Sequence, residues 1–491
     1  MRLLISTYAC APNLGSEHAV GWNWTTEAHR QGHQVWALAS PAHRDAIESA
    51  CRHCPDLRGI HWTFPEVRLW PLRSATEPKW ERSYNLLWQR AALRHVRELV
   101  QEVKFDAVHH LTWAGIRAPT FLGSLGVPLI IGPIGGGETS PPLLRDGFAL
   151  RGRILERIRD LSSSTITINP LVRSGLTEAA VIFASTSDTR DLFTGTLRQK
   201  ILIFSQVAIP GLPSISPRTP RQGPPRLLFA GRLLYWKGVH LAIDAFAQLS
   251  HRIDGARLTI VGDGPERDRL HALAASRRIL DHVDFIPRLP QKSLFELYDS
   301  NDLLLFPSLH DSGGFVVLEA LSRGLPVVCL DLGGPKEIVT PQSGVIVSTG
   351  GRNSAEVAVA LADVMFQVLA SPTRLSALSA GAIARANQFL LSNRLTDFYK
   401  LAADAIGFSG DNGSRAGYEQ PREHLDLEEL HARLGVSFLH WDRAKGVSLT
   451  AKAIWSPVVI GHLDGPGALI EQAQHDVMSC SLSGRPGSRR H

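Results

Sequence analysis

Short apolar stretches alternate with longer amphipathic segments along the first part of the chain. RLLIS, QVWALAS, FDAVHHL, VPLIIGP and AAVIFAS begin at positions 2, 34, 105, 127 and 179, and a helix is predicted over residues 17–31. Continuous apolar runs of this length, separated by helices, are typical of parallel strands that are buried on both faces of a sheet. The pattern therefore predicts an α/β domain with a doubly wound sheet.

A second series of the same kind follows a proline-rich break. Residues 209–226 hold six prolines, which preclude a regular element and indicate a linker. Beyond it, the apolar stretches RLLFAGRL, RLTIVGDG, VDFIPRL, DLLLFPS, PVVCLDLGG and GVIVS are separated by predicted helices that begin at Val239, Glu266, Lys292 and Val316. We expect two Rossmann-like doubly wound parallel-sheet domains, residues 1–208 and 227–390, facing each other across a cleft.

The end of the chain departs from this alternation. Helices are predicted over residues 353–370 and 374–405, and we expect the last of this helical region, residues 391–407, to pack back on the first domain. Residues 409–491 contain one helical patch between loop-like ends, so we expect a weakly ordered extension to which no role is assigned.

Length and charge add two constraints. At 491 residues the chain exceeds the roughly 250–300 residues that one core supports, which agrees with two domains. The net charge of +6 is concentrated in residues 1–222, where 25 Lys and Arg minus 18 Asp and Glu give +7, and the remaining 27 minus 28 give −1. A cationic first half suits acidic lipid headgroups, nucleic acid or a phosphate-bearing substrate, and charge alone does not choose among them.

The cysteines and the apolar segments indicate a cytoplasmic protein. Five cysteines at irregular spacing fit reduced thiols better than a disulfide framework, and the single CxxC of Cys51 and Cys54 has no second pair with which to hold zinc. The apolar opening is too short for a membrane span. We expect any membrane contact to be peripheral, with acidic lipids on the inner face of the plasma membrane. The amphipathic helix predicted from Trp80 to Val103 is a candidate for it, although a packed surface helix is the favoured interpretation.

The most specific stretch of the chain is FPSLHDSGGFVVLEALSRGLPVVCLDLGGPKEIV, from Phe306 to Val339. It places Asp311 and Glu319 eight residues apart. Between them, glycines let the backbone approach a ligand, and the first N–H groups of a helix can bind a phosphate with help from the helix dipole. These positions are Gly313, Gly314, Phe315, Val316 and Val317. Glu319 lies where it can accept hydrogen bonds from a ribose diol, although an ordinary strand-to-helix turn is the alternative.

A second candidate stretch is LLFAGRLLYWKGVHLAIDAF, in which Arg232 and Lys237 follow a predicted strand and precede the helix at Val239. Parallel sheets bind ligands at the carboxyl ends of their strands, and two cations there can neutralise a departing diphosphate. Taken alone, either cation is equally well interpreted as a solvated surface residue.

Together these stretches resemble the donor domain of the retaining glycosyltransferase family 4, whose members have the GT-B fold. The motifs of that family occur here in order: Gly231-Arg232-Leu233, Lys237-Gly238, Gly262-Asp263-Gly264-Pro265, Pro307-Ser308, Asp311 to Glu319, Gly324-Leu325-Pro326-Val327 and Gly333-Gly334. Their joint occurrence is far more specific than any one of them. The resemblance extends with less support over residues 1–405 and does not include the tail.

The resemblance implies a role for each matched position. Arg232 and Lys237 would hold the donor diphosphate and stabilise it as the leaving group, and Glu319 would hold the ribose hydroxyls. Asp311 and the backbone of residues 313–317 would hold the donor sugar and its phosphate. Four further positions complete the expected donor site, the last three of them beside the nucleotide base: Gly262, Ile286, Pro287 and Arg288.

Two positions of this motif depart from the family. Asp311 stands where the family usually has glutamate, and Gly313 stands where it has phenylalanine. The shorter acid puts in doubt which hydroxyl of the donor sugar is recognised. In addition, SQVAIP near Ser205 replaces the family's Pro-Asn-Gly turn.

The first domain offers further candidates. Gly15 and Ser16 lie in PNLGSEHAVG, which resembles the family's glycine loop at the interface between donor and acceptor. His109 and His110 end a predicted strand where the family commonly has His-x-His, so which of them is catalytic stays open, and a structural role is the alternative. The glycine-rich GPIGGGETS suits a loop that closes over substrate, with Glu138 binding an acceptor hydroxyl.

These observations lead to one expected activity and two alternatives. No Asp-x-Asp triplet occurs in the chain, so we expect no metal and no other cofactor. The resemblance implies retaining, metal-independent hexosyl transfer from a nucleotide-diphosphate sugar to a glycan or lipid-linked acceptor, in bacterial surface or exported polysaccharide synthesis. A nucleotide-sugar epimerase of the same architecture and a non-catalytic subunit that binds nucleotide sugar are the alternatives. Nucleic acid is not an expected partner.

Overall fold

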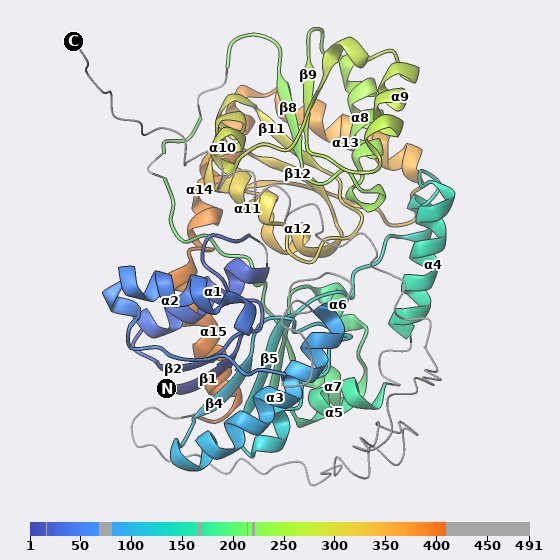
Figure 1. Cartoon of the computed structure of the whole chain (residues 1–491). Coiled ribbons are helices and arrows are strands. Elements are labelled where there is room, and N and C mark those ends of the chain that lie inside the picture. Colours follow the sequence, from blue (N-terminus) through green and yellow to red (C-terminus); the bar gives the residue numbers. More distant parts are fainter. Residues whose placement is uncertain (16, 68–80, 165–168, 214, 219–220, 409–491) are drawn as a thin grey trace, which may run out of the picture.

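The computed structural model describes residues 1–15, 17–67, 81–164, 169–213, 215–218 and 221–408. These residues form two α/β domains, one above the other in Figure 1, with the two sheets built from separate parts of the chain. The expected extension over residues 409–491 and the expected loop residue Ser16 lie outside the described residues.

The first domain is built on a seven-stranded parallel sheet in the order β3-β2-β1-β4-β5-β6-β7. Its strands are β1 (Arg2–Ser6), β2 (Gln34–Leu38), β3 (His61–Thr63), β4 (Ala107–His110), β5 (Leu129–Ile134), β6 (Val181–Ala184) and β7 (Ile201–Ile203). Its helices are α1 (Glu17–Arg30), α2 (Arg44–His53), α3 (Glu81–Glu102), α4 (Leu150–Ser164), α5 (Pro170–Glu178), α6 (Ser187–Asp191) and α7 (Gly195–Gln199). Alternate residues of β1 enter opposite cores, Leu4 on the side of α3 and Leu3 and Ile5 on the side of α1, as a sheet covered on both faces requires.

The second domain is built on a six-stranded parallel sheet in the order β10-β9-β8-β11-β12-β13. Its strands are β8 (Arg226–Ala230), β9 (Arg257–Val261), β10 (Val283–Ile286), β11 (Leu303–Phe306), β12 (Val327–Leu330) and β13 (Gly344–Val347). Its helices are α8 (Val239–Ser250), α9 (Arg267–Ser276), α10 (Gln291–Ser300), α11 (Phe315–Ser322), α12 (Gly333–Ile338), α13 (Ser354–Leu369) and α14 (Pro372–Asn387). The alternation of apolar stretches and helices thus predicted two parallel sheets and every strand of the second, but it missed the edge strands β3 and β7 of the first.

The single helix predicted over residues 374–405 is wrong, because the chain breaks after α14 and starts again as α15 (Leu391–Ala405). At the break, the backbone of Ile209 accepts a hydrogen bond from Leu391 N at 2.8 Å and donates to Phe389 O at 3.0 Å. This short parallel bridge ties the start of the linker to the end of the second domain.

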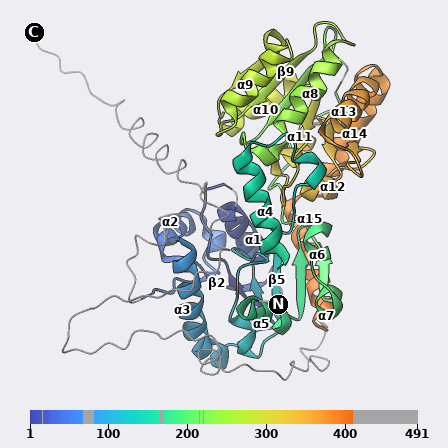
Figure 2. The same ribbon diagram turned by 90° about the vertical axis from the view of Figure 1, so that its right-hand side faces the viewer.

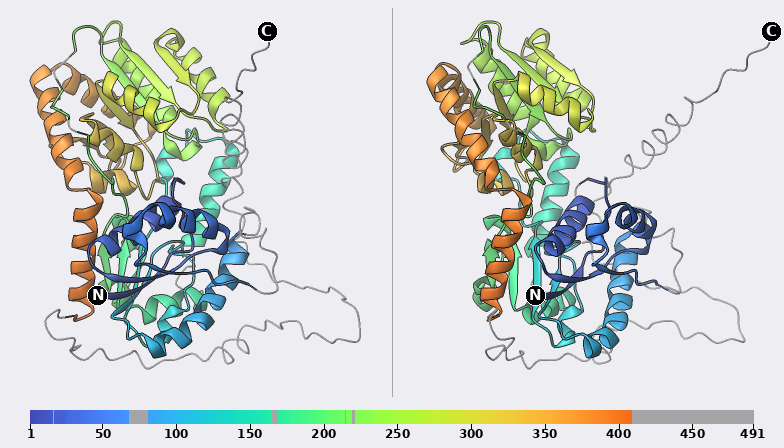
Figure 3. Two further views of the ribbon diagram at one scale, coloured as in Figure 1. Left: turned by 60° about the vertical axis from the view of Figure 1, so that its left-hand side comes forward. Right: turned by 90° about the vertical axis from the view of Figure 1, so that its left-hand side faces the viewer.

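Helix α15 returns to the first domain, alongside its sheet in Figure 3. The ring of Phe398 is fully buried, 4.3 Å from the ring of Phe183 and 5.0 Å from that of Trp24. Among the described residues, no single helix is long and apolar enough to cross a membrane, and α13 with α14 passes that test only as a pair bent by 99°.

Candidate active site

The second sheet changes direction between β8 and β11, since the chain builds β8, β9 and β10 to one side and β11, β12 and β13 to the other. Open α/β sheets bind ligands at the carboxyl ends of strands at such a point. The loops that follow β8 and β11 are in close contact there: a Cβ added to Gly238, whose φ is +68°, would lie 1.8 Å from the carbonyl oxygen of Pro307. Only glycine permits this approach.

Lys237 and Asp311 meet where these loops touch. Lys237 Nζ lies 2.6 Å from Asp311 Oδ2, and the two side chains are 17% and 18% exposed. Asp311 Oδ1 accepts hydrogen bonds from the amides of Gly313 at 3.2 Å and Gly314 at 3.3 Å. Burial alone would raise the pKa of Asp311, but the Lys237 ammonium and the two amides hold that pKa below its ordinary value. The structure therefore fixes a cation at the switch point of the sheet, held by an ionised partner.

Arg232 follows β8 in the same loop, and its side chain is exposed. Within the described part of the chain, the guanidinium of Arg232 makes no hydrogen bond or ion pair, while its carbonyl accepts from Leu234 N at 2.9 Å. The neighbouring backbone is held in place, because Leu233 N donates to Asp263 O at 2.9 Å. Arg232 thus stands near Lys237 as a second cation whose charge is not compensated by a protein group.

The start of helix α11 carries backbone amides that lie next to the Lys237–Asp311 pair. Its N-cap is Gly314, with φ at +73°, and the Phe315 and Val316 amides have no hydrogen-bond acceptor among the described residues. Val317 N donates to Gly314 O at 3.0 Å, so the third amide expected to bind phosphate is used within the helix. Two helix amides, rather than three, remain for an anion.

Glu319 lies one turn further along α11 and is already hydrogen-bonded. Its carboxylate accepts from Gln291 Nε2 at 3.0 Å and from the hydroxyl of Tyr298 at 3.1 Å. Burial raises the pKa of Glu319, and the two hydrogen bonds oppose that rise. The carboxylate is therefore oriented by side chains of α10 before any ligand is present.

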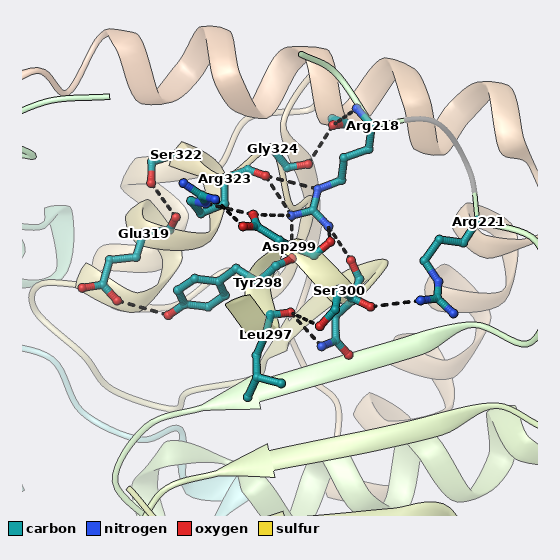
Figure 4. A network of polar contacts seen from close by, with 12 residues as sticks. Arg218, Arg221, Leu297, Tyr298, Asp299, Ser300, Glu319, Ser322, Arg323 and Gly324 are labelled. Atoms are coloured by element: carbon teal, nitrogen blue, oxygen red, sulfur yellow. Dashed lines mark hydrogen bonds and ion pairs between the residues drawn. The ribbon is translucent and has the colours of Figure 1, made fainter. Parts of the chain in front are cut away.

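The linker stabilises this arrangement through Arg218, which no sequence pattern singled out. Figure 4 shows its guanidinium among carbonyl groups at the ends of α10 and α11. It donates to Tyr298 O and Asn301 O, both at 2.5 Å, and to Arg323 O at 2.8 Å. A cation among the last carbonyls of two helices satisfies acceptors that the helices leave unpaired. Arg218 thereby holds the helices that carry Tyr298 and Glu319.

The residues expected near the base lie at the same carboxyl edge. Gly262 N donates to Ile286 O at 2.9 Å, and Asp263 Oδ2 accepts from Arg288 N at 2.8 Å. Gly262 has φ at +146°, and a Cβ there would lie 1.9 Å from Gly231 O. Pro287 and Arg288 are exposed. The structure thus brings this segment next to the loop of Arg232 and leaves its outer surface open.

The two histidines of β4 face opposite sides of the first sheet. His109 is fully buried beside α15, with Nε2 2.7 Å from Gly132 O and Nδ1 3.1 Å from the hydroxyl of Tyr399. His110 is 1% exposed, and neither of its ring nitrogens has a hydrogen-bond partner among the described residues. Burial lowers the pKa of His109 to about 4 and that of His110 to about 3, so both rings are neutral at pH 7. His109 is therefore a structural residue in this conformation, and His110 keeps both nitrogens uncommitted.

Glu138 is not an open acceptor-binding group in this structure. It is 3% exposed, and its carboxylate accepts from the hydroxyls of Thr186 at 2.6 Å and Thr189 at 2.9 Å and from Gly136 N at 3.0 Å. Ser312 of the second domain also donates to it, at 2.5 Å. Glu138 therefore links the glycine-rich loop of the first domain to the residue that follows Asp311. Gly15, by contrast, is exposed with no atom within 4 Å of an added Cβ.

A second link between the domains is centred on Glu156, which sequence analysis missed because α4 was not predicted. Its side chain is fully buried and accepts from His310 Nε2 and the Tyr235 hydroxyl, both at 3.2 Å, and from Ser140 N at 3.3 Å. His310 precedes Asp311, and Tyr235 lies two residues before Lys237. One carboxylate of the first domain thus contacts both loops that form the ion pair.

Within the described residues there is no cluster of three or more His, Cys, Asp or Glu side chains that could hold a metal ion. The positive groups at the switch point are Arg232, Lys237 and the first amides of α11. Cations and free helix amides of this kind can bind an anion such as a diphosphate.

Residues 214–371 match the family model of the group 1 glycosyl transferases. A glycogen synthase of Mycobacterium tuberculosis is 37% identical over 213 residues, which are 43% of this chain and 48% of the relative. A D-inositol 3-phosphate glycosyltransferase of Nocardia farcinica is 32% identical over 224 residues, 44% of this chain and 48% of the relative. The chain therefore spans about half the length of these curated relatives.

Solved structures resemble a larger part of the chain than these curated relatives do, since the matches extend over both domains. The lipopolysaccharide outer core galactosyltransferase WaaB superposes with a TM-score of 0.55 at 14% identity, covering 82% of this chain and 99% of that one. A sucrose-phosphate synthase from Thermosynechococcus elongatus gives 0.54 at 17%, and Anabaena HepE in complex with UDP gives 0.53 at 16%. They cover 82% of this chain and 99% and 100% of their own. The chain has the GT-B fold, as the sequence predicted, while assignment to family 4 stays a prediction.

Proposed function

We propose that the protein is a retaining glycosyltransferase that moves a sugar from a nucleotide-diphosphate sugar to a glycan or a lipid-linked acceptor. The observation that carries the proposal is the Lys237–Asp311 pair at the switch point of the second sheet, with Arg232, the first amides of α11 and Glu319 around it. A diphosphate needs cations and amides, and a ribose needs an acceptor such as a carboxylate. The site supplies both within one domain.

The proposed step breaks the bond between the anomeric carbon of the donor sugar and its phosphate oxygen. The diphosphate leaves with the electron pair, and Lys237, Arg232 and the amides of Phe315 and Val316 stabilise its growing charge. The acceptor oxygen bonds to the same face of the sugar, and its proton passes to the departing phosphate oxygen. Because the acceptor bonds on the face from which the diphosphate leaves, the configuration at the anomeric carbon is retained, and no protein carboxylate has to attack.

The donor is proposed to be a nucleoside-diphosphate sugar whose base rests near Ile286 to Arg288. The Anabaena neighbour of the same fold was solved with UDP, which supports this class of donor. The acceptor is proposed to belong to bacterial surface or exported polysaccharide synthesis on the cytoplasmic side of the membrane. The basic first half of the chain and the similarity of fold to a lipopolysaccharide galactosyltransferase support that choice.

Donor binding can be tested without knowing the acceptor. A panel of UDP-, GDP- and ADP-sugars is expected to contain one that raises the unfolding temperature, because a ligand at a hundredfold excess over its Kd stabilises the folded state by roughly 2.7 kcal/mol. Glu319→Ala should abolish most of this shift, since it removes the ribose acceptor. Glu296→Ala, an exposed carboxylate on α10, is the matched control and should keep it. Equal shifts in both variants would contradict the assignment of Glu319.

Metal independence is proposed on the basis of the same cations and is tested separately. Transfer by protein treated with EDTA is expected to equal that of untreated protein, since Lys237, Arg232 and the α11 amides carry the diphosphate charge. Release of nucleotide with and without acceptor separates transfer from binding alone. A loss of activity in EDTA that magnesium restores would overturn this part of the mechanism.

A further inference from the structure

Helix α4 carries an apolar stripe on its outer face. Leu150, Ile154 and Leu161 are 74%, 47% and 63% exposed, and their spacing of four and seven residues places them on one side of an α-helix. Leu143, in the turn before the helix, is 55% exposed. These four make up more than a third of the eleven exposed large hydrophobic side chains in the described part of the chain, so exposed apolar side chains are concentrated in residues 143–161.

The opposite face of α4 is fixed against the second domain. A Cβ on Gly152 would lie 3.1 Å from the ring of Tyr235, and the side chain of Glu156 is fully buried beside His310. Figure 2 shows α4 in front of both domains, on the face turned to the viewer. The inner face is therefore occupied, and the stripe points to solvent because the helix cannot rotate without breaking these contacts.

Arginines flank the stripe on both sides. Arg151 lies about 100° around the helix from Leu150, and Arg153 and Arg157 lie on the other side, all three exposed. The Arg153 guanidinium donates to Asp146 O at 2.7 Å and to Phe148 O at 3.1 Å. On that second side a surface hollow of about 330 Å³ is lined by Pro142, Arg145, Asp146, Arg153 and Arg157. An apolar centre between cations is the pattern of a helix that lies in the interface of an anionic bilayer.

We propose that the outer face of α4, defined by Leu150, Ile154, Leu161 and the flanking arginines, docks on a bilayer surface that carries anionic phospholipids. The leucines and the isoleucine enter the boundary between headgroups and acyl chains, while the arginines reach the phosphates. Its consequence for the reaction rests on the proposed function: a lipid-linked acceptor would then lie in the membrane that the protein already contacts.

The structure favours α4 over α3 for this contact. The amphipathic segment that forms α3 is a candidate from sequence for which a packed helix is the favoured interpretation, and its apolar residues Tyr84, Trp88 and Ala92 are indeed fully buried. A second copy of this chain is also a poor occupant, because a two-fold contact through the stripe would bring arginines of both copies together. An anionic surface instead satisfies the apolar and the charged residues at once.

Sedimentation with vesicles tests the proposal on the full-length protein. Binding to phosphatidylcholine vesicles that contain phosphatidylglycerol is expected to exceed binding to pure phosphatidylcholine and to weaken with salt. The double variant Leu150→Asp with Ile154→Asp should lower binding at least tenfold, since two buried aliphatic side chains are lost. The variant Arg157→Ser should lower it about fivefold and flatten the salt dependence.

Leu401→Asp is the matched control, a 41% exposed leucine on α15, and should bind as the unchanged protein does. All variants alter exposed residues, so unfolding temperatures and the shift caused by a nucleotide sugar should stay unchanged, which separates this test from that of the proposed function. Equal binding by the α4 variants and the control would overturn the proposal. So would failure of the unchanged protein to bind anionic vesicles, or a dimer in solution that the Leu150 and Ile154 changes dissolve.

Discussion

Replacing Lys237 with methionine is expected to lower the rate of sugar transfer by roughly a hundred- to a thousandfold. Methionine keeps the length of the side chain and removes its charge, so the diphosphate leaves without the cation that the structure fixes 2.6 Å from Asp311. The loss should appear in kcat, because the charge on the leaving group grows only as the bond breaks. Lys292→Met, an exposed lysine on α10, should transfer at the ordinary rate.

The ion pair complicates this experiment, and a second variant resolves it. Lys237→Met alone leaves the largely buried Asp311 carboxylate without its partner, which destabilises the fold as well as the reaction. Combining it with Asp311→Asn removes both charges, so the double variant should regain much of the lost unfolding temperature. It should not regain transfer. Recovery of both together would show that Lys237 only holds the loop, and the leaving-group role would then be wrong.

Much of this site could be predicted from sequence because its parts are local. Each of the turns that follow β8 and β11 is formed by consecutive residues with a recognisable motif. Parallel sheets place the turns that follow their strands at one edge. The pairing of Lys237 with Asp311, 74 residues apart, follows from that topology once β8 and β11 are known to be neighbours. The glycine motif around Gly314 likewise marked the amides of α11, although one of the three expected amides is used within the helix.

The residues that could not be predicted from sequence either contact residues far away in the chain or lie on elements without a clear hydrophobic pattern. Arg218 was assigned only to a proline-rich linker, and nothing local shows that its guanidinium reaches carbonyls of residues 298 and 323. The short edge strands β3 and β7 have three residues each, too few for a periodic pattern. Helix α4 exposes apolar residues and buries Glu156, the reverse of what an amphipathic pattern leads one to expect.

The predicted helix over residues 374–405 failed for a related reason. Residues on both sides of the break favour helix, and the interruption at Gln388–Leu390 comes from backbone pairing with Ile209, about 180 residues earlier in the chain. Tertiary pairing overrides local preference there. The break lets α15 return to the first domain, so the two domains are joined by this crossing as well as by the linker.

Glu156→Gln is expected to lower the stability of the fold at pH 7 by about 1.5–3 kcal/mol, because hydrogen bonds to a buried carboxylate are weakened, and to leave the acid limit of stability nearly unchanged. Burial alone would raise the pKa of Glu156, but the hydrogen bond from His310 and the charge of Arg159 lower it from 4.5 to about 2. Burial also lowers the pKa of His310, so its ring is neutral at pH 7. A group whose folded pKa lies below its unfolded pKa contributes stability above the unfolded value, and that stability is lost as the pH falls through the folded value.

The measurement is denaturant unfolding at a series of pH values between 7 and 3. An amide resembles a protonated carboxyl group, so the variant should lose less stability than the unchanged protein on acidification, and the two curves should converge towards pH 2. Asp160→Asn, one turn further along α4 and 42% exposed in its pair with Arg145, is the control and should change little. Parallel curves for Glu156→Gln and the unchanged protein would mean that Glu156 is not ionised in the fold. The contact between α4 and the loops of Lys237 and Asp311 would then have to be explained by packing alone.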